Sequence, residues 1–249
     1  MLCDGRPEYF EASCRAYGHV WSPLTLGARR DLHARFFRLR PVIMSGWEMP
    51  LLVRALVTGA TDRRVLASWT TVREALVRTV DLPRDEVVAL LRAALDAVRR
   101  DWIRVAPYAW LRAHRPYLPL PALRRLVARP ARTVVVTTKE GEFARRILDA
   151  WRVEVAAVHG KERGEHKCDN LRELVAADGG ELWFVEDRLE TLECVAACTP
   201  AVPELARVRL FLAAWGYNVP AARAVARRHA RIRLLSRAAF ARGLAAWPT

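Results

Sequence analysis

Lysine is scarce in this sequence, although the chain is strongly basic. Of the 41 lysine and arginine residues, only Lys139, Lys161 and Lys167 are lysines, and the formal net charge is +14 at pH 7. A charge of this size is typical of proteins that bind polyanions. Here the arginines are scattered along the chain, and the excess of arginine and alanine is what a GC-rich genome produces. The charge therefore does not predict nucleic acid as a partner.

Cysteine is also infrequent, and its pattern does not suggest a disulfide framework. The five cysteines are an odd number in a chain without a secretory leader, so free thiols are expected. Cys194 and Cys198 are one helical turn apart, and His159, His166 and Cys168 form a loose group in the sequence. No CxxC pair accompanies them, so the spacing does not predict a zinc site.

A long apolar run is missing as well. Hydrophobic residues make up 52% and charged residues 27% of the chain, near the averages of globular proteins. No stretch approaches the roughly 18 consecutive apolar residues of a membrane span. The first residues lack the basic and then apolar order of a signal peptide. We therefore expect a cytoplasmic protein with no membrane partner.

The first part of the chain has the apolar spacing of helices. Between Val87 and Trp102 the apolar residues fall on one stripe with polar residues between them, as in an amphipathic helix. Pro83 suits the first turn of this helix, and the acidic residues Asp85 and Glu86 complement the positive end of its dipole. Shorter helices are predicted over residues 30–39, 48–57 and 71–80.

After Pro121 the pattern alternates between helices and short strands. Strands are predicted over residues 133–137, 153–158, 182–185, 208–213 and 232–235. Helices are predicted over residues 122–128, 143–151, 167–177 and 191–197. This alternation predicts a parallel sheet between helices. The expected fold class is therefore α/β, with a Rossmann-like parallel sheet core preceded by a helical block.

Two of the predicted strands end in residues suited to phosphate and metal binding, and ligands of parallel sheets gather at the carboxyl ends of strands. Thr137 and Thr138 follow an apolar strand, where the hydroxyl of Thr137 and nearby backbone N–H groups would hold a phosphoryl oxygen. Glu186 and Asp187 follow another, where two adjacent carboxylates need a cation or hydrogen-bond donors. A Mg²⁺ ion held by one or two carboxylates fits that placement.

Each of these residues also has a structural interpretation. Threonine is common at strand ends, and Asp187 would serve as a helix N-cap or as an ion-pair partner of Arg188. Lys167 opens the helix predicted over residues 167–177, where its charge opposes the helix dipole. Phosphate binding would explain that position, and a solvated surface lysine is the alternative. The residues alone leave these alternatives open.

The order of these features resembles motifs two, three and four of the haloacid dehalogenase-like (HAD) hydrolase superfamily. In that superfamily a strand ending in threonine precedes a lysine that opens a helix, and a strand ending in paired acids follows. Arg40-Pro41 and Gly46-Trp47-Glu48 resemble helical-cap sequences of phosphoglycolate-phosphatase-like members. Residues 4–10 (DGRPEYF) and 215–218 (WGYN) resemble a branch found in cyanobacteria and plants.

The resemblance implies a domain organisation and a reaction. Residues 1–14 and 116–249 would form the Rossmann-like core, and residues 15–115 an inserted all-helical cap. The reaction would be hydrolysis of a small phosphorylated metabolite, by a Mg²⁺-dependent phosphatase that forms an aspartyl-phosphate.

The resemblance also implies roles for individual residues. Thr137 would bind the phosphoryl group, Lys167 would stabilise its charge, and Glu186 with Asp187 would hold Mg²⁺. Substrate contacts would come from Thr138 and from two cap residues, Arg40 and Glu48. The structural alternative for Arg40 and Glu48 is a surface ion pair, and that for Trp47 is packing.

The sequence has no DxDG motif, which carries the nucleophilic aspartate in that superfamily. Leu2 stands two residues before Asp4, and a leucine side chain cannot attack phosphorus. We therefore expect the true start to lie upstream of Met1, with the first strand of the core and both motif aspartates. The alternative is a catalytically inactive HAD-like binding or scaffold protein.

Overall fold

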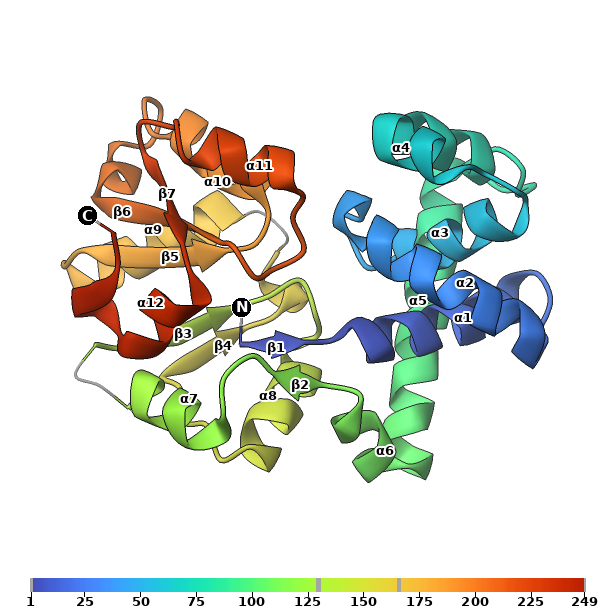
Figure 1. Ribbon diagram of the computed structural model, residues 1–249, viewed down its shortest axis with the longest axis horizontal. Helices are drawn as coiled ribbons and strands as arrows, with labels where there is room; N and C mark the ends of the chain where they lie inside the picture. The colour runs from blue at the N-terminus through green and yellow to red at the C-terminus, as the bar shows by residue number, and fades with distance from the viewer. Residues whose placement is uncertain (1, 129–130, 165–166, 249) are drawn as a thin grey trace. The chain divides into compact units, whose positions relative to one another are not determined.

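The computed structural model describes residues 2–128, 131–164 and 167–248. The chain is a mixed α/β protein with small parallel sheets. It divides into two compact units (Figure 1). The helical unit is Gly5–Arg115, and the α/β unit comprises Met1–Asp4 and Pro116–Thr249.

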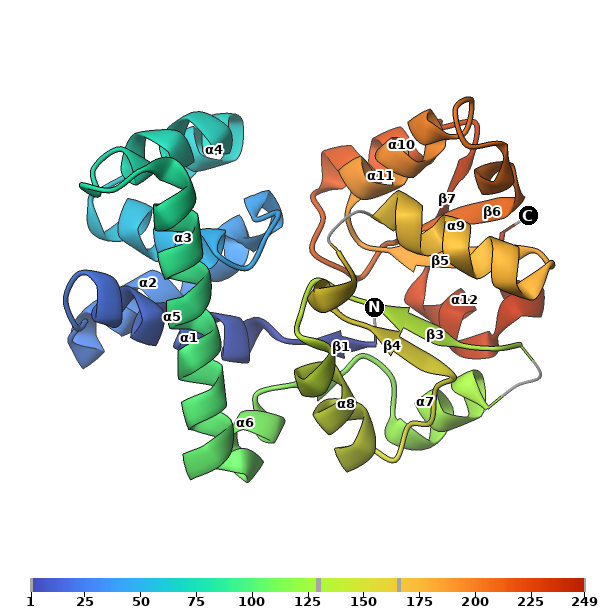
Figure 2. The same cartoon turned by 180° about the vertical axis from the view of Figure 1, so that it is seen from behind.

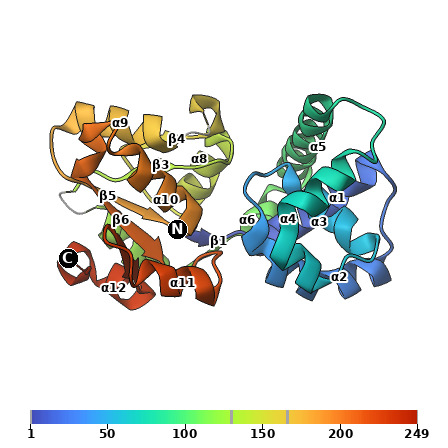
Figure 3. The same cartoon turned by 90° about the horizontal axis from the view of Figure 1, so that it is seen from above.

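The helices between Arg6 and Val105 share one hydrophobic core, and Figure 3 shows these helices grouped together. Fully buried core residues include Phe36, Leu51 and Leu91, and burying such a side chain contributes about 1.5–3 kcal/mol. The elements are α1 (Arg6–Val20), α2 (Leu26–Leu39), the 3-10 helix η1 (Arg40–Val42), α3 (Glu48–Val57), α4 (Asp62–Val77), α5 (Arg84–Val105) and α6 (Pro107–Arg112). α1 packs against both α3 and α5.

The helices predicted for this unit are confirmed, with changes of bounds for α2 and α4. The helix predicted over residues 48–57 has the bounds of α3, and the apolar stripe lies in α5. α2 begins at Leu26, before the predicted residue 30. α4 begins at Asp62, where the hydroxyl of its N-cap Thr61 accepts a hydrogen bond from the Arg64 amide at 3.3 Å. It is kinked at Ser68 (φ −149°, ψ 45°), and the helix predicted over residues 71–80 overlaps the part after this kink.

Residues 5–14 lie in the helical unit rather than with the residues expected to form the core. α1 buries Phe10 and Cys14 in the helical core. Its Glu8 is also buried and pairs with Arg99 of α5, with 2.6 Å between Oε1 and Nε. The chain therefore enters the helical unit at Gly5, earlier than the expected residue 15.

The α/β unit alternates between helices and strands. Its strands are β3 (Val134–Val136), β4 (Ala157–His159), β5 (Leu182–Glu186), β6 (Val208–Ala213) and β7 (Ile232–Leu235), and β1 (Cys3–Asp4) pairs with β2 (Arg115–Pro116). Its helices are α7 (Leu120–Val127), α8 (Gly141–Ala150), α9 (Lys167–Asp178), α10 (Leu189–Cys198), α11 (Pro220–Ala226) and α12 (Arg237–Arg242), with short 3-10 turns η2 (Lys161–Arg163), η3 (Pro203–Arg207) and η4 (Leu244–Ala246).

The longer strands pair in parallel, but in two sheets instead of one. In the first sheet β3 pairs with β4, and Val136 lies opposite His159. In the second the order is β5-β6-β7, and Glu186 lies opposite Leu212, which lies opposite Leu234. The parallel pairing agrees with the alternation in the sequence. The division into two sheets was not expected.

Side chains of β5 and β6 alternate between two faces of the second sheet. Phe184 and Leu212 belong to a core shared with α9 and α10. On the other face Trp183 and Phe211 lie 5.5 and 5.1 Å from the ring of Trp247, measured between ring centroids. Figures 1 and 2 accordingly show α9 and α12 on opposite sides of this sheet. The unit thus has the helix–sheet–helix layering that parallel strands require.

The strand predictions hold for β6 and β7, whose bounds are those expected. β4 is shorter than the predicted strand at 153–158, because the exit from α8 occupies these residues: Arg152 has a φ of 51°, and the Val153 amide donates to Leu148 O at 2.9 Å. β3 is half-buried along its length. α11 and α12 were not predicted.

The described helices include none that is long and apolar enough to cross a membrane. α5 has 22 residues, but charged side chains recur along it.

Candidate functional site

Lys167 brings the carboxyl ends of β3 and β5 together. It is the first residue of α9, and its Nζ donates a hydrogen bond to the carbonyl oxygen of Val136, the last residue of β3, at 3.0 Å. Its charge also interacts with the carboxylates of Glu186 and Asp187 at the end of β5. Lys167 therefore lies between the end of β3, which Thr137 follows, and the paired acids Glu186 and Asp187.

Burial governs the protonation of this lysine. Removal of Lys167 from water lowers its pKa below the usual range, because desolvation penalises the ammonium form. The nearby carboxylates of Glu186 and Asp187 oppose that shift. A solvated surface lysine, the alternative considered for Lys167, is thus excluded.

Glu186 is half-buried, and its carboxyl closes a tight turn at the end of β5. Its Oε1 accepts hydrogen bonds from the Asp187 amide at 2.8 Å and from the Arg188 amide at 3.2 Å. Burial, and next the charge of Asp187, raise the pKa of Glu186 to about 8, while Lys167 acts in the opposite direction. A further positive charge at the site would therefore favour the ionised form of this carboxyl.

Asp187 is buried and held by the loop that follows β6. Its Oδ2 accepts a hydrogen bond from the Tyr217 amide at 2.9 Å, and its backbone oxygen accepts one from Nδ2 of Asn218 at 3.0 Å. Gly216 permits this close approach, since a Cβ there would lie 2.1 Å from the Cβ of Asp187. Asp187 does not cap α10, whose N-cap is Arg188.

Tyr217 extends the site to the start of the chain. While its amide binds Asp187, its hydroxyl donates a hydrogen bond to Oδ1 of Asp4 at 3.1 Å. Asp4 ends β1 and lies in the same α/β unit. No role was predicted for Tyr217 and Asn218. They follow the carboxyl end of β6, and that position in the sequence could have marked them as site residues.

Thr137 lies beside the Lys167 contact. Its amide donates to the His159 carbonyl at 2.9 Å, which extends the pairing of β3 with β4. Its Oγ1 accepts a hydrogen bond from the Lys139 amide at 3.1 Å. A hydroxyl that accepts one bond still has a proton to donate to an anionic oxygen. Thr138 is exposed.

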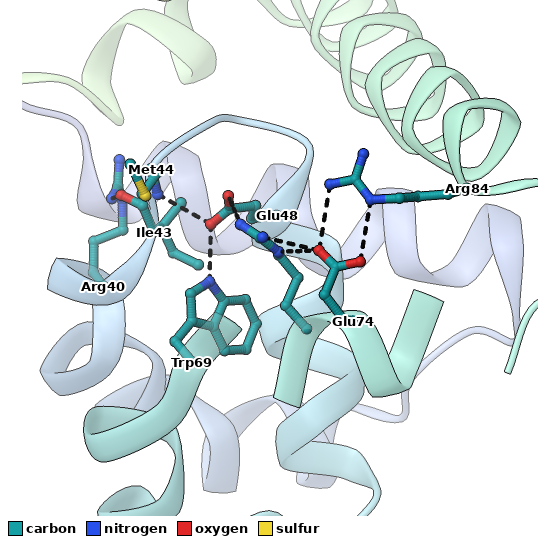
Figure 4. A network of polar contacts seen from close by, with 8 residues as sticks. Arg40, Ile43, Met44, Glu48, Trp69, Glu74 and Arg84 are labelled. Atoms are coloured by element: carbon teal, nitrogen blue, oxygen red, sulfur yellow. Dashed lines mark hydrogen bonds and ion pairs between the residues drawn. The ribbon is translucent and has the colours of Figure 1, made fainter. Parts of the chain in front are cut away.

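Glu48, expected to bind substrate, lies in the interior of the helical unit (Figure 4). Its Oε2 accepts hydrogen bonds from the Met44 amide at 3.0 Å and from Nε1 of Trp69 at 2.8 Å, and its Oε1 binds Nη1 of Arg73 at 2.9 Å. These contacts make Glu48 a buried structural carboxylate. The alternative of a surface pair with Arg40 is therefore also wrong.

Arg40 is half-buried in the helical unit. Its Nη1 donates to the Ile43 carbonyl at 3.3 Å, and its guanidinium lies 4.9 Å from the ring centroid of Tyr9. Trp47 is buried in the helical core, as the packing interpretation expects. Substrate contact by Arg40 stays a prediction.

The donor groups at the end of β5 fit Mg²⁺. This ion prefers oxygen ligands and is commonly held by one or two carboxylates, waters and substrate phosphate oxygens. Glu186 and Asp187 supply adjacent carboxylates at the end of β5. The residues present are therefore suited to a divalent cation.

Comparisons of the chain with protein-family models, with curated proteins and with solved structures return no match.

Proposed function

We propose that the protein is a Mg²⁺-dependent phosphatase of the HAD-like type that acts on a small phosphorylated metabolite. In this proposal the α/β unit is a Rossmann-like core and the helical unit is its cap. The observation that carries the proposal is the position of Lys167, whose ammonium contacts the end of β3 and interacts with both acids at the end of β5. A cation between a hydroxyl-bearing strand end and paired carboxylates suits a phosphate bound with a metal ion.

Each residue of the site has a distinct role in this proposal. The Lys167 ammonium neutralises charge on the phosphoryl oxygens, and the Thr137 hydroxyl donates a hydrogen bond to one of them. Glu186 and Asp187 hold Mg²⁺, and when bound the ion neutralises further phosphate charge. Tyr217, through its amide, orients the Asp187 carboxylate.

Burial strengthens these interactions. The polar groups of the site are buried or half-buried, so they act in a medium less polar than water. Each electrostatic contact with a phosphate is stronger in such a medium. The hydrogen bonds of Glu186 and Asp187 to backbone amides fix both side chains before a ligand arrives. Such preorganisation reduces the cost of reorganising the site during phosphoryl transfer.

β3 and β5 each carry site residues at their carboxyl ends, and the described residues pair them in separate sheets. The resemblance implies a nucleophilic aspartate in a DxDG motif. No residue of this sequence is assigned as the nucleophile.

A second candidate is a phosphate-binding protein without hydrolysis. It is favoured by one observation, Leu2, which stands where the DxDG spacing before Asp4 would require an aspartate. Such a protein would use Lys167, Thr137 and the acid pair to bind a phosphorylated ligand and release it unchanged.

The test is phosphate release from a panel of small phosphomonoesters, measured with Mg²⁺ and with a chelator. For a form of the protein that carries the nucleophilic aspartate, the phosphatase proposal predicts release that needs Mg²⁺ and falls at least about a hundredfold in Asp187→Asn, as expected when a metal ligand is lost. Asp149→Asn is the matched control, because Asp149 is exposed on α8. Circular dichroism of both variants verifies that they are folded.

Two other outcomes have defined meanings. Mg²⁺-dependent binding of the phosphomonoesters without release selects the binding protein. If the chain shows neither release nor Mg²⁺-dependent binding, both candidate functions are rejected.

A further inference from the structure

Three thiols that are far apart in the sequence meet in the α/β unit. Cys168 is in the first turn of α9, and Cys194 and Cys198 are one turn apart on α10. Their Sγ atoms all lie within 4.8 Å of one another. Those of Cys168 and Cys198 are 3.2 Å apart. The sequence hinted at this group only through the spacing of Cys194 and Cys198.

The packing of α9 against α10 creates this cluster. Residues four apart lie on the same face of a helix, so Cys194 and Cys198 face α9 together. Leu171 of α9 and Val195 of α10 belong to the same buried core, which fixes the two helices side by side. His159 was grouped with these cysteines in the sequence, but its Nδ1 forms a hydrogen bond with Oδ1 of Asn170, with 3.3 Å between the two atoms. His166 lies outside the described residues.

We propose that Cys168, Cys194 and Cys198 form a binding site for one thiophilic divalent cation, with Zn²⁺ as the representative ion. Zinc–sulfur bonds of roughly 2.3 Å place neighbouring sulfur atoms about 4 Å apart. The observed cluster needs only side-chain adjustment to reach that spacing. Three protein ligands leave the fourth position of the tetrahedral ion for water.

The chemistry of the cluster favours a soft cation over Mg²⁺. Thiolates select zinc and similar ions, whereas Mg²⁺ prefers oxygen ligands, so this site is separate from the one proposed at Glu186 and Asp187. On binding, three S–H bonds are replaced by three Zn–S bonds, and the protons pass to solvent. Neither zinc nor sulfur changes its oxidation state, so no oxidant is required.

The position of the cluster allows an ion to enter. Cys194 is exposed, while Cys168 and Cys198 are half-buried, so the site opens to solvent at one ligand. Burial and the neighbouring thiols of Cys198 and Cys194 raise the pKa of Cys168, so its proton leaves for solvent only when the cation binds. An ion bound here would tie α9 to α10 directly beside Lys167.

The experiment uses the reduced, metal-free full chain and Co²⁺ as a spectroscopic substitute for Zn²⁺. The expected result is a thiolate-to-cobalt charge-transfer band that saturates at one equivalent and disappears when Zn²⁺ is added. Cys194→Ser should lose the band or bind at least about tenfold more weakly, because it removes one of three ligands. Cys3→Ser, a cysteine outside the cluster, should bind as the unchanged chain does.

A thermal melt provides an independent readout. Zn²⁺ should raise the Tm of the unchanged chain and of Cys3→Ser, but not that of Cys194→Ser, since binding stabilises only a folded site. The proposal is overturned if the unchanged chain gives no thiolate band. It is equally overturned if Cys194→Ser binds cobalt with unaltered affinity. Both readouts are independent of phosphate release.

Discussion

At Glu186, burial and a neighbouring carboxylate both oppose ionisation. They raise the pKa of this carboxyl from its ordinary 4.5 to about 8. The proton on Glu186 therefore stabilises the folded state fully below the ordinary pKa, and this stabilisation is lost as the pH rises towards 8. A bound divalent cation would reverse the effect, because it favours the ionised form.

We predict that Glu186→Gln flattens the pH dependence of stability in the metal-free protein. Between about pH 5 and pH 8 the unchanged chain should lose about 1 kcal/mol of unfolding free energy per pH unit from this group, whereas glutamine stays neutral. Urea unfolding with a chelator present measures the difference. Glu190→Gln, an exposed acid on α10, is the control. Equal slopes in Glu186→Gln and the unchanged chain would contradict the assigned shift.

The burial of Glu48 could not be predicted from its residue type and local sequence. A carboxylate beside tryptophan in a cap-like sequence was expected to contact substrate, but the side chain is only 2% exposed and binds Trp69 and Arg73. Nothing in the local sequence indicates that Trp69 and Arg73, from a different helix, provide its partners. Burial of a charge is set by packing between elements, which the sequence does not display.

Removal of this carboxylate should be costly. Glu48→Ala leaves the Arg73 guanidinium and the Trp69 N–H without their buried acceptor, so we predict a loss of about 3 kcal/mol or more of unfolding free energy. Asp85→Ala is the matched control, because its side chain is 98% exposed. Guanidinium unfolding measures both. A loss below about 1 kcal/mol in Glu48→Ala would show that this network does not support the helical unit.

At the scale of elements, the strand ends were predictable and the loop around them was not. The apolar run of β5 followed by Glu186 and Asp187, and the placement of Lys167 at the start of α9, are visible in the sequence because each is a local pattern. The contact between Asp187 and Tyr217 joins residues 30 apart in the chain. Such a contact leaves no periodic signal, so only the structure shows it.

The loop after β6 yields the next prediction. Gly216→Ala would place a Cβ 2.1 Å from the Cβ of Asp187, so the loop or Asp187 must move. We expect a loss of about 1–3 kcal/mol in unfolding free energy and weaker Mg²⁺ binding. Gly27→Ala is the control, because the added Cβ meets only Thr25 Oγ1 at 3.9 Å and alanine favours helix α2. If Gly216→Ala has the same unfolding free energy and Mg²⁺ affinity as the wild-type chain, the close approach of Gly216 to Asp187 is refuted.

For the whole molecule, the change from helical to alternating patterns near Pro116 was visible in the sequence and coincides with the division into units. The start of the helical unit at Gly5 was not visible in the sequence, because the composition of the chain does not change where α1 begins. The separation of the strands into two sheets was also hidden. Strand patterns indicate which segments are strands, but not which strands are neighbours.

The helical unit should fold by itself. Its core runs from Phe10 to Val98, and its buried Glu8 finds its partner Arg99 within the same unit. We predict that residues 5–115, expressed alone, give a helical circular dichroism spectrum and one cooperative thermal transition. A spectrum of an unfolded chain would show that this segment depends on the α/β unit.

The most direct test of the central claim is a calorimetric titration of the full chain with inorganic phosphate, with Mg²⁺ and with a chelator. We predict binding that requires Mg²⁺ and is weakened at least about tenfold, or 1.4 kcal/mol, in Lys167→Met. Lys161→Met, in which the lost ammonium pairs with Glu140 at 3.3 Å, should bind as the unchanged chain does. A phosphate affinity that does not depend on Mg²⁺ would contradict a phosphate and metal site at the carboxyl ends of β3 and β5. Equal phosphate affinities of Lys167→Met and Lys161→Met would contradict it as well.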